Sequence, residues 1–420
     1  MRHRVSLASL ASIPLCLVSF AACTISSNDD ASQPSAPSPA AASADTPMTP
    51  PSTPAANAPA PTPTPSPVDT GAVFTISNAT DANEVLAFAR DMDGKLTPAG
   101  VYPTGGRGSG AGLGSQGALA LSEDNSVLVV VDAGSNQISS FTVEGSDLVF
   151  RSRVSSGGTS PISITVHGGL VYALNGGSPS NISGFKLDAQ GKLSPLAGST
   201  RSLSMATAAP AQVSFNPKGD TLVVTEKNTD KIDTFVVMQD GTPSAGDVID
   251  SMGKTPFGFA FAPTGALVIT EAFGAAEGKG AVSSYAFDKV LHAGAKGGAE
   301  RGVTSVSASI ANEQTAPCWA VITKDGRFAY SANTPSATIS AYALDAEGKL
   351  ALMGDGAAAK TGDGSKPVDM TLDRSSKHLY VLNSGTRHIK AMDVAADGSL
   401  TARVDGNPET PPSAFGLIGY

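Results

Sequence analysis

The chain has 420 residues, a formal net charge of -9 at pH 7, 45 glycines and 29 prolines. An acidic chain without a basic stripe argues against nucleic-acid binding, because cations that neutralise phosphates supply most of that affinity. Of its three cysteines, Cys16 and Cys23 lie near the N-terminus, so the rest of the chain holds only Cys318 and no internal disulfide is expected there.

Residues 1–22 have the organisation of an export signal. The short basic stretch MRHR precedes VSLASLASIPLCLVSF, an apolar stretch too short to be read as a membrane span. The segment Phe20-Ala21-Ala22-Cys23 resembles a bacterial lipobox, which predicts that Cys23 is lipidated. Ordinary signal cleavage with an unmodified Cys23 stays open, because Phe20 stands where leucine is usual. We expect an exported protein of the cell envelope, facing the periplasm or the exterior and touching the membrane only through this lipid, and Thr24 favours the outer membrane.

Residues 23–68 are rich in Pro, Ala, Ser and Thr and end in PAPTPTPSPV. Such a segment cannot bury enough apolar surface to fold, and its prolines favour extended polyproline II. We expect it to be a disordered tether between the lipid and a folded domain at 69–420.

An internal repeat with a period of roughly fifty residues fills the remainder. Each copy has an alternating apolar run that ends in a polar residue, a few turn residues, and a second alternating run. The seven first runs are VFTISN (73–78), VLVVVD (127–132), LVYALN (170–175), LVVTE (222–226), LVITE (267–271), FAYSAN (328–333) and LYVLN (379–383).

A further strand that opens near proline precedes most copies, as in PAQVSFNPKGD, and a hairpin signal such as DAQGKL follows them. Four short strands per repeat, seven times over, predict an all-β, seven-bladed β-propeller of four-stranded antiparallel blades. The first copy lacks its preceding strand, and the chain ends in PPSAFGLIGY. We therefore expect the C-terminal strand to pair into the N-terminal blade, and a ring closed in this way is expected to be a monomer.

Several motifs invite comparison with metal and nucleotide sites. GLGSQG (112–117) matches the dinucleotide-binding pattern, but the strand-like ALALS follows it instead of a helix, which favours a loop between blades. The histidines outside the leader lack the spacing of metal ligands on one element, and the Asp-Gly turns lack the ligand ladder of a calcium loop. We expect no metal and no cofactor.

Glu226 and Glu271 end the equivalent strand in adjacent copies, where the others carry Asn or Asp. Two carboxylates that converge at one mouth of the central channel would serve as acid and base, or hold a cation. The alternative is that this position caps a turn through a side-chain oxygen.

The repeats resemble the propeller lactonase family, which includes 6-phosphogluconolactonase and the fungal carboxymuconate cyclases. The shared pattern is clearest in PAQVSFNPKGDTLVVTE and PFGFAFAPTGALVITE, and the resemblance covers roughly residues 70–420. Phrases such as NGGSPSNISGF and QTAPCW are similar to a secreted bacterial branch.

The resemblance implies a catalytic histidine, two arginines and a glutamate at the channel mouth. These fall on Ala211, Phe257, Cys318 and Glu271 of this chain, so only the glutamate is kept. The loss of both arginines implies a substrate less anionic than a sugar phosphate. Gln212, Phe257, Cys318 and Trp319 are expected at the substrate-binding mouth, where a stacking or packing role for Trp319 is favoured over catalysis by Cys318.

The leading hypothesis is therefore a lipid-anchored, lactonase-like propeller that hydrolyses a lactone or a similar small cyclic ester, with Glu271 as the main catalytic residue and Glu226 as a helper. The alternative is a non-catalytic propeller that holds a ligand or a protein partner at the cell envelope. A metal-dependent hydrolase built on the two glutamates lacks a supporting histidine.

Overall fold

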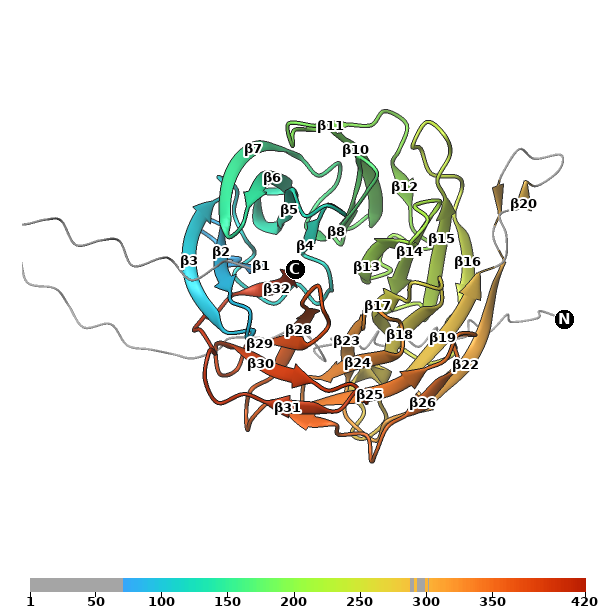
Figure 1. Ribbon diagram of the computed structural model, residues 1–420. Helices are drawn as coiled ribbons and strands as arrows, with labels where there is room; N and C mark the ends of the chain where they lie inside the picture. The colour runs from blue at the N-terminus through green and yellow to red at the C-terminus, as the bar shows by residue number, and fades with distance from the viewer. Residues whose placement is uncertain (1–70, 288–290, 293–298, 301) are drawn as a thin grey trace, which may run out of the picture.

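Seven antiparallel sheets stand around a central axis in the computed structural model (Figure 1). The structure describes residues 71–287, 291–292, 299–300 and 302–420. The predicted signal peptide (1–22) and tether (23–68) lie outside the described residues. Within the described part, no helix is long and apolar enough to cross a membrane. Its helical segments are the 3-10 turns η1 (Ala133–Ser135) and η2 (Phe273–Ala275).

Each sheet is one blade, and we letter the blades A to G in the order of their second strands. The inner strands, which line the axis, are β32 (Phe415–Gly419), β4 (Leu119–Leu121), β8 (Pro161–His167), β13 (Pro210–Phe215), β17 (Pro256–Phe261), β23 (Pro317–Ile322) and β28 (Pro367–Leu372). The second strands are β1 (Gly71–Ile76), β5 (Val127–Asp132), β9 (Leu170–Asn175), β14 (Thr221–Glu226), β18 (Leu267–Glu271), β24 (Phe328–Asn333) and β29 (His378–Asn383).

The outer half of each blade is built in the same order. The third strands are β2 (Glu84–Arg90), β6 (Gln137–Glu144), β10 (Asn181–Leu187), β15 (Lys231–Val236), β19 (Ala281–Phe287), β25 (Thr338–Leu344) and β30 (His388–Val394). The outermost strands are β3 (Leu96–Pro103), β7 (Asp147–Ser155), β11 (Leu193–Pro195) with β12 (Arg201–Ser202), β16 (Asp247–Asp250), β22 (Val303–Ala311), β26 (Leu350–Leu352) with β27 (Ala359–Lys360), and β31 (Leu400–Ala402). A separate hairpin joins β20 (Leu291–His292) and β21 (Ala299–Glu300).

The predicted seven-bladed propeller is confirmed. In blades C and F the fourth strand is split into two short pieces that both pair with the third strand. The first repeat differs slightly from its prediction, because β1 ends at Ile76 and Asn78 adopts a left-handed conformation (φ 49°) beyond it.

The C-terminal strand closes the ring as expected. Strand β32 pairs antiparallel with β1, with Phe415 opposite Ile76 and Gly419 opposite Val73. Blade A is therefore built from both ends of the propeller, which leaves no unpaired edge at the axis side of β1.

Strand direction defines two faces of the ring. Inner strands begin, and second strands end, on what we call the upper face; for example, Pro210 lies opposite Glu226. The hairpins between inner and second strands, and those between third and fourth strands, lie on the lower face. The core occupies the spaces between blades, where second-strand residues such as Val129, Val171 and Leu379 are fully buried.

Candidate functional site

The two glutamates singled out by the repeat lie at the upper face in neighbouring blades, Glu226 in blade D and Glu271 in blade E. Both side chains are fully buried. No hydrogen bond joins them, and each is held by donors from its own blade or from the loop that leads into it. Among the described residues, no group of three or more His, Cys, Asp or Glu is placed to hold a metal ion.

Glu226 belongs to a buried pair of carboxyl groups. Its Oε1 accepts a hydrogen bond from the Ser204 N–H at 2.9 Å, and its Oε2 accepts from the hydroxyls of Ser204 and Thr229. Asp233 of β15 bonds to Glu226, and its Oδ2 shares the Ser204 N–H at 3.2 Å. Burial, together with the charge of Glu226, raises the pKa of Asp233, so Asp233 holds a proton where an ordinary aspartate would not.

The position of Asp233 is unusual among the repeats. The third strands of blades B, E and F have serine there, and each serine hydroxyl bonds to the polar residue that ends the second strand: Ser139 to Asp132, Ser283 to Glu271, Ser340 to Asn333. A hydroxyl satisfies that residue without an extra charge. A second carboxyl group does so only when it is protonated, and buried pairs of this kind gather at functional sites.

Asp233 is also incompletely satisfied, because its Oδ1 is buried without a hydrogen-bond partner in the described chain. The pair lies close to solvent, since Ser204 is exposed and Thr229 is half-buried. Sequence reasoning missed Asp233 and Ser204. The change from serine to aspartate at one place in the repeat (KIDTF against AVSSY and TISAY) was the signal for Asp233.

The hydrogen-bond partners of Glu271 are all uncharged groups, whereas Glu226 lies beside a second carboxyl group. It accepts hydrogen bonds from the Gly253 N–H at 2.8 Å, from Ser309 Oγ at 2.7 Å and from the hydroxyl of Ser283. Burial raises the pKa of Glu271 in spite of these donors. It therefore caps local backbone and hydroxyl groups, and its predicted catalytic role stays a prediction.

Three of the residues predicted at the channel mouth, Phe257, Cys318 and Trp319, are fully buried. The rings of Phe257 and Trp319 lie 5.3 Å apart, and Phe415 lies 6.3 Å from Trp319 on the other side. Cys318 and Ala211, at two of the family's catalytic positions, are fully buried. At this end the axis is filled with side chains.

The GLGSQG loop also fills the upper end of the axis. It runs into β4 with no helix, as expected. The Trp319 indole N–H donates to Ser115 O at 2.9 Å, and Ser115 Oγ donates to Ile162 O at 2.7 Å. The Gln116 amide reaches across the axis to blade F, where it accepts from the Ala320 N–H at 3.0 Å and donates to Ala320 O at 2.8 Å. We call residues 112–117 the plug.

Lys227, which sequence reasoning also missed, fastens the plug to blade D. Its ammonium donates to Gly114 O and lies 4.8 Å from the centre of the Phe257 ring. Burial lowers its pKa to about 7. No sequence signal marks it, because it simply follows the strand that Glu226 ends.

Gln212 lies below the plug and lines the open part of the channel. Its amide pairs with the edge of β17, accepting from the Phe259 N–H at 2.7 Å and donating to Phe259 O at 3.1 Å. Of the residues predicted at the substrate-binding mouth, Gln212 is therefore the one that borders a cavity.

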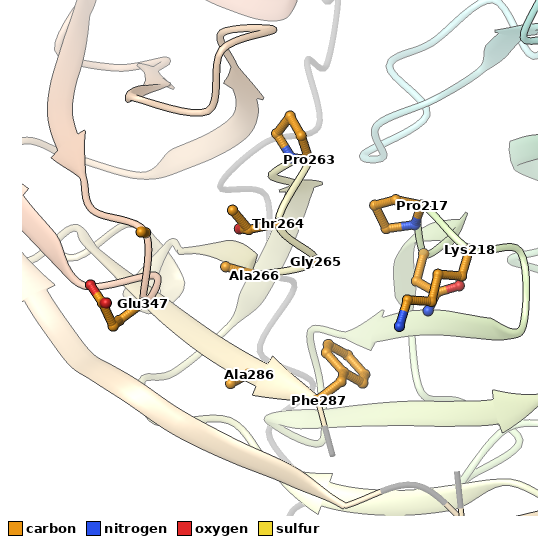
Figure 2. Close-up of a pocket in the computed structure, with 11 residues that line it drawn as sticks. Pro217, Lys218, Pro263, Thr264, Gly265, Ala266, Ala286, Phe287 and Glu347 are labelled. Carbon is orange, nitrogen blue, oxygen red and sulfur yellow. The ribbon is translucent and has the colours of Figure 1, made fainter. Parts of the chain in front are cut away.

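A separate pocket of about 240 Å³ lies on the lower face between blades D, E and F. Figure 2 shows Lys218 and Phe287 on one side of this pocket and Glu347 on the other. None of the predicted site residues lines it.

Comparisons with known proteins agree with this architecture. The family model described as "Lactonase, 7-bladed beta-propeller" matches residues 81–204 and 296–413, together more than half of the chain. No match is found among curated proteins.

Three solved structures with the same fold illustrate the likeness. A putative 6-phosphogluconolactonase from Bacteroides uniformis is 18% identical, with a TM-score of 0.64 over 83% of this chain and 99% of that one. A protein from Lactobacillus plantarum is 19% identical, with a TM-score of 0.65 and the same coverage. The periplasmic gluconolactonase of Pseudomonas aeruginosa is 17% identical, with a TM-score of 0.62 over 83% and 99% of the two chains. The structural likeness shows the fold, and the family model gives the membership: the chain belongs to the seven-bladed β-propeller lactonase family.

Proposed function

We propose that this protein hydrolyses a lactone or a similar small cyclic ester at the upper face of blade D. The observation that carries the proposal is the contact of three groups: the exposed Ser204 hydroxyl donates to Glu226, and Asp233 is bonded to the same carboxylate. A hydroxyl beside a base that a third group orients is the arrangement of an activated nucleophile. Family membership, and the gluconolactonase among similar structures, support a lactone as the substrate class.

The proposed reaction proceeds through an ester of Ser204 and needs no cofactor. Glu226 accepts the Ser204 proton as Ser204 Oγ bonds to the lactone carbonyl carbon, and it passes that proton to the ring oxygen as the ring C–O bond breaks. Water then attacks the resulting ester, and its oxygen bonds to the carbonyl carbon as it gives one proton to Glu226. Glu226 passes this proton to Ser204 Oγ as the bond between Ser204 and the carbonyl carbon breaks, which releases the hydroxy acid and restores both residues. Asp233 keeps its proton throughout and holds Glu226 in place.

The test is ring opening of neutral and carboxylate-bearing lactones by the purified protein, followed by acid release. Ser204→Ala and Glu226→Gln are each expected to lower kcat by about 100-fold or more. Asp233→Ser gives blade D the serine found in blades B, E and F, so the protein should stay folded while turnover falls. Because the reaction needs a protonated Asp233, wild-type turnover should also decline as pH rises through its raised pKa.

Glu271→Gln is the matched control in blade E, at the position that family resemblance assigns to the catalytic glutamate. If it abolishes turnover while Ser204→Ala does not, catalysis belongs to blade E and this proposal is wrong. If the folded protein opens no lactone of either charge, the propeller is a binding platform for a ligand or a protein partner.

We also propose that the protein is exported, anchored through a lipid on Cys23 and monomeric. The leader and the lipobox-like segment before Cys23 support the anchor, and the closed ring supports a monomer. Labelling with an alkyne-bearing fatty acid should mark the wild type in the membrane fraction, and Cys23→Ala should lose both the label and the membrane association. Retention of the label by Cys23→Ala would contradict the anchor.

A further inference from the structure

The central channel is closed at the upper face and open at the lower face. The plug fills its upper end, where Gln116 bridges the axis to blade F. Below the plug lies a cavity of about 470 Å³, which ends at the lower face with Glu123 and Lys324 on its border. The size lies within the range of small-molecule sites. A ligand therefore reaches this cavity from the lower face, the face opposite Ser204.

The rim of the cavity carries charges of both signs. Glu123, Asp124, Lys324 and Arg374 together border an adjoining hollow of about 460 Å³. Hydrogen bonds, that from the Ser122 hydroxyl first, lower the pKa of Asp124 to about 2, so its carboxylate keeps its charge beside the two cations. Because charges of opposite sign offset one another here, the rim gives no advantage to a ligand of either charge.

Inside the rim, the cavity is polar but uncharged at neutral pH. Its surface is mainly polar, and Asp369 is the ionisable side chain among the described residues that line it above the rim. Burial raises the pKa of Asp369 to about 8, so its carboxyl group is protonated at neutral pH. A charged ligand would lose its hydration in this cavity without meeting an opposite charge, which favours an uncharged ligand.

Two threonine hydroxyls of the wall have a hydrogen left to donate. Thr165 Oγ1 accepts a hydrogen bond from the Phe215 N–H at 3.2 Å, and Thr371 Oγ1 accepts one from the Gly419 N–H at 3.0 Å. A hydroxyl can accept and donate at once, and neither O–H has an acceptor in the described part of the chain. Both threonines line the cavity and are only 8% exposed. A ligand or water inside the cavity must therefore take these two bonds.

These hydroxyls belong to one layer of the wall, which has one residue from each inner strand at an equivalent position. The hydroxyl members, in blades C, D and G, are Thr165, Ser214 and Thr371. The apolar members, in blades A, B, E and F, are Ile418, Ala120, Ala260 and Val321. The blades follow one another round the axis in the order A to G. The apolar pairs A–B and E–F therefore lie on opposite sides of the cavity, with the hydroxyls between them.

We propose that the channel is a second binding site, which takes a small uncharged cyclic polyol. A six-membered ring with equatorial hydroxyls presents C–H groups on both faces and hydroxyls round its edge. Its faces cover the two apolar pairs, and its edge bonds to the hydroxyl members of the layer. Thr165 and Thr371 donate to it, whereas Ser214 accepts, because Ser214 Oγ already donates to Phe215 O at 3.1 Å. The site is separate from Ser204 and performs no chemistry on its ligand.

Isothermal titration of the full chain with myo-inositol, sorbitol, cyclohexanol and quinate tests this proposal. We expect myo-inositol to bind. Sorbitol, the open-chain polyol with the same number of carbons, should bind at least about tenfold more weakly, because it must order its rotatable bonds. Cyclohexanol has a single hydroxyl for the polar edge, and quinate adds a carboxylate that the uncharged wall does not pair, so neither should bind.

Two substitutions remove a hydroxyl but keep the shape of the side chain. Thr165→Val and Thr371→Val should each weaken myo-inositol binding by about five- to tenfold, the value of one hydrogen bond, while Thr165→Ser should bind as the wild type does. Ser163→Ala is the matched control. It removes the same kind of support from a strand edge, the Val213 N–H, at a residue outside the lining of the cavity, and it should leave binding unchanged.

Ala260→Phe fills the cavity from its wall and should abolish binding, whereas Ser204→Ala, at the upper face, should not change it. An absence of myo-inositol binding to the folded wild type would mean that the channel holds water alone, and the proposal would be wrong. Equal binding of sorbitol or quinate, the same loss in Ser163→Ala and Thr165→Val, or a loss in Ser204→Ala would each overturn it too. Because binding is measured without turnover, a failed lactone assay does not affect this result.

Discussion

Side chains of the channel wall act as hydrogen-bond acceptors for the free edges of neighbouring inner strands. Each such bond runs from one blade to the next: Ser163 Oγ accepts from the Val213 N–H at 3.1 Å, Gln212 Oε1 from Phe259 at 2.7 Å and Asp369 Oδ2 from Leu417 at 3.0 Å. These caps satisfy edge N–H groups that would otherwise be buried without partners. Asp369 is the ionisable member of this set.

Asp369 should make the stability of the ring depend on pH. Burial raises its pKa to about 8, although the N–H groups of Met370 and Leu417 oppose the shift. From about pH 4 to pH 8 the native state therefore holds a proton that the unfolded state has lost, and wild-type stability falls as pH rises. The Asp369→Asn variant has no titrating group at this position. The difference between its free energy of unfolding and that of the wild type should therefore shift in favour of the variant by roughly 2–4 kcal/mol between pH 5 and pH 8. Urea unfolding measures this difference. A difference that does not change with pH would contradict this account.

Gly258 should be needed for the plug. A Cβ atom at this position would meet Gln116 Oε1 and the Cys318 carbonyl oxygen. Gly258→Ala should displace the Gln116 amide from Ala320 and cost about 1–3 kcal/mol. In a double-mutant cycle with Gln116→Ala, part of that cost should disappear, because the amide that is displaced is already gone. Strictly additive effects would show that the crowding is with backbone alone.

At the scale of strands, the sequence predicted four of the seven second strands to the residue. The reason is physical: each is a largely apolar stretch of five or six positions that ends in a polar residue, as in VLVVVD and LVITE. The plug was not predictable, because its bonds join Ser115 and Gln116 to residues of blades C and F that are distant in the chain. The contacts of Lys227 and the hydrogen bond of Ser204 with Glu226 were not predictable for the same reason, because these groups come together only in the closed ring.

Hydrogen bonds, which we call ties, join turns of one blade to the second strand of the preceding blade. In each tie a tyrosine hydroxyl donates to the carbonyl of a turn glycine: Tyr172 to Gly241 at 2.5 Å, Tyr330 to Gly398 at 2.9 Å and Tyr380 to Gly94 at 2.7 Å. The Asp-Gly turns noted in the sequence thus include direct contacts between blades.

Loss of one such hydroxyl should destabilise the ring by about 0.5–1.5 kcal/mol, the net value of one buried hydrogen bond. Tyr330→Phe and Tyr380→Phe test this by thermal or urea unfolding. Tyr342→Phe is the matched control, because its buried hydroxyl has no partner in good hydrogen-bond geometry among the described residues. That variant should be neutral or slightly more stable. Equal losses in all three would mean that the ties contribute nothing specific.

At the scale of the whole molecule, the ring is closed by a strand only five residues long. Its Phe415 is 1% exposed and contacts Trp319 in the aromatic cluster, and Thr75 Oγ1 of β1 donates to Gly416 O at 2.6 Å. Arg90 of β2 adds a bond to Tyr420 O at 3.1 Å and lies 3.8 Å from Asp373 of blade G. Packing, backbone pairing and charge therefore all meet at the seam between blades G and A.

Removal of residues 414–420 should open the ring, because it exposes the edge of β1 and empties the space that Phe415 fills. We expect the truncated protein to unfold at a lower temperature and less cooperatively, and to self-associate, as judged by circular dichroism and size-exclusion chromatography. Phe415→Ala should give a graded version of the same defect, about 3–5 kcal/mol of lost stability in a protein that still closes. A synthetic peptide of residues 414–420 should raise the midpoint of thermal unfolding of the truncated chain, since it binds the closed form alone. If truncation leaves that midpoint unchanged, blades B to G hold the ring without the strand, and closure through blade A is not what stabilises this fold.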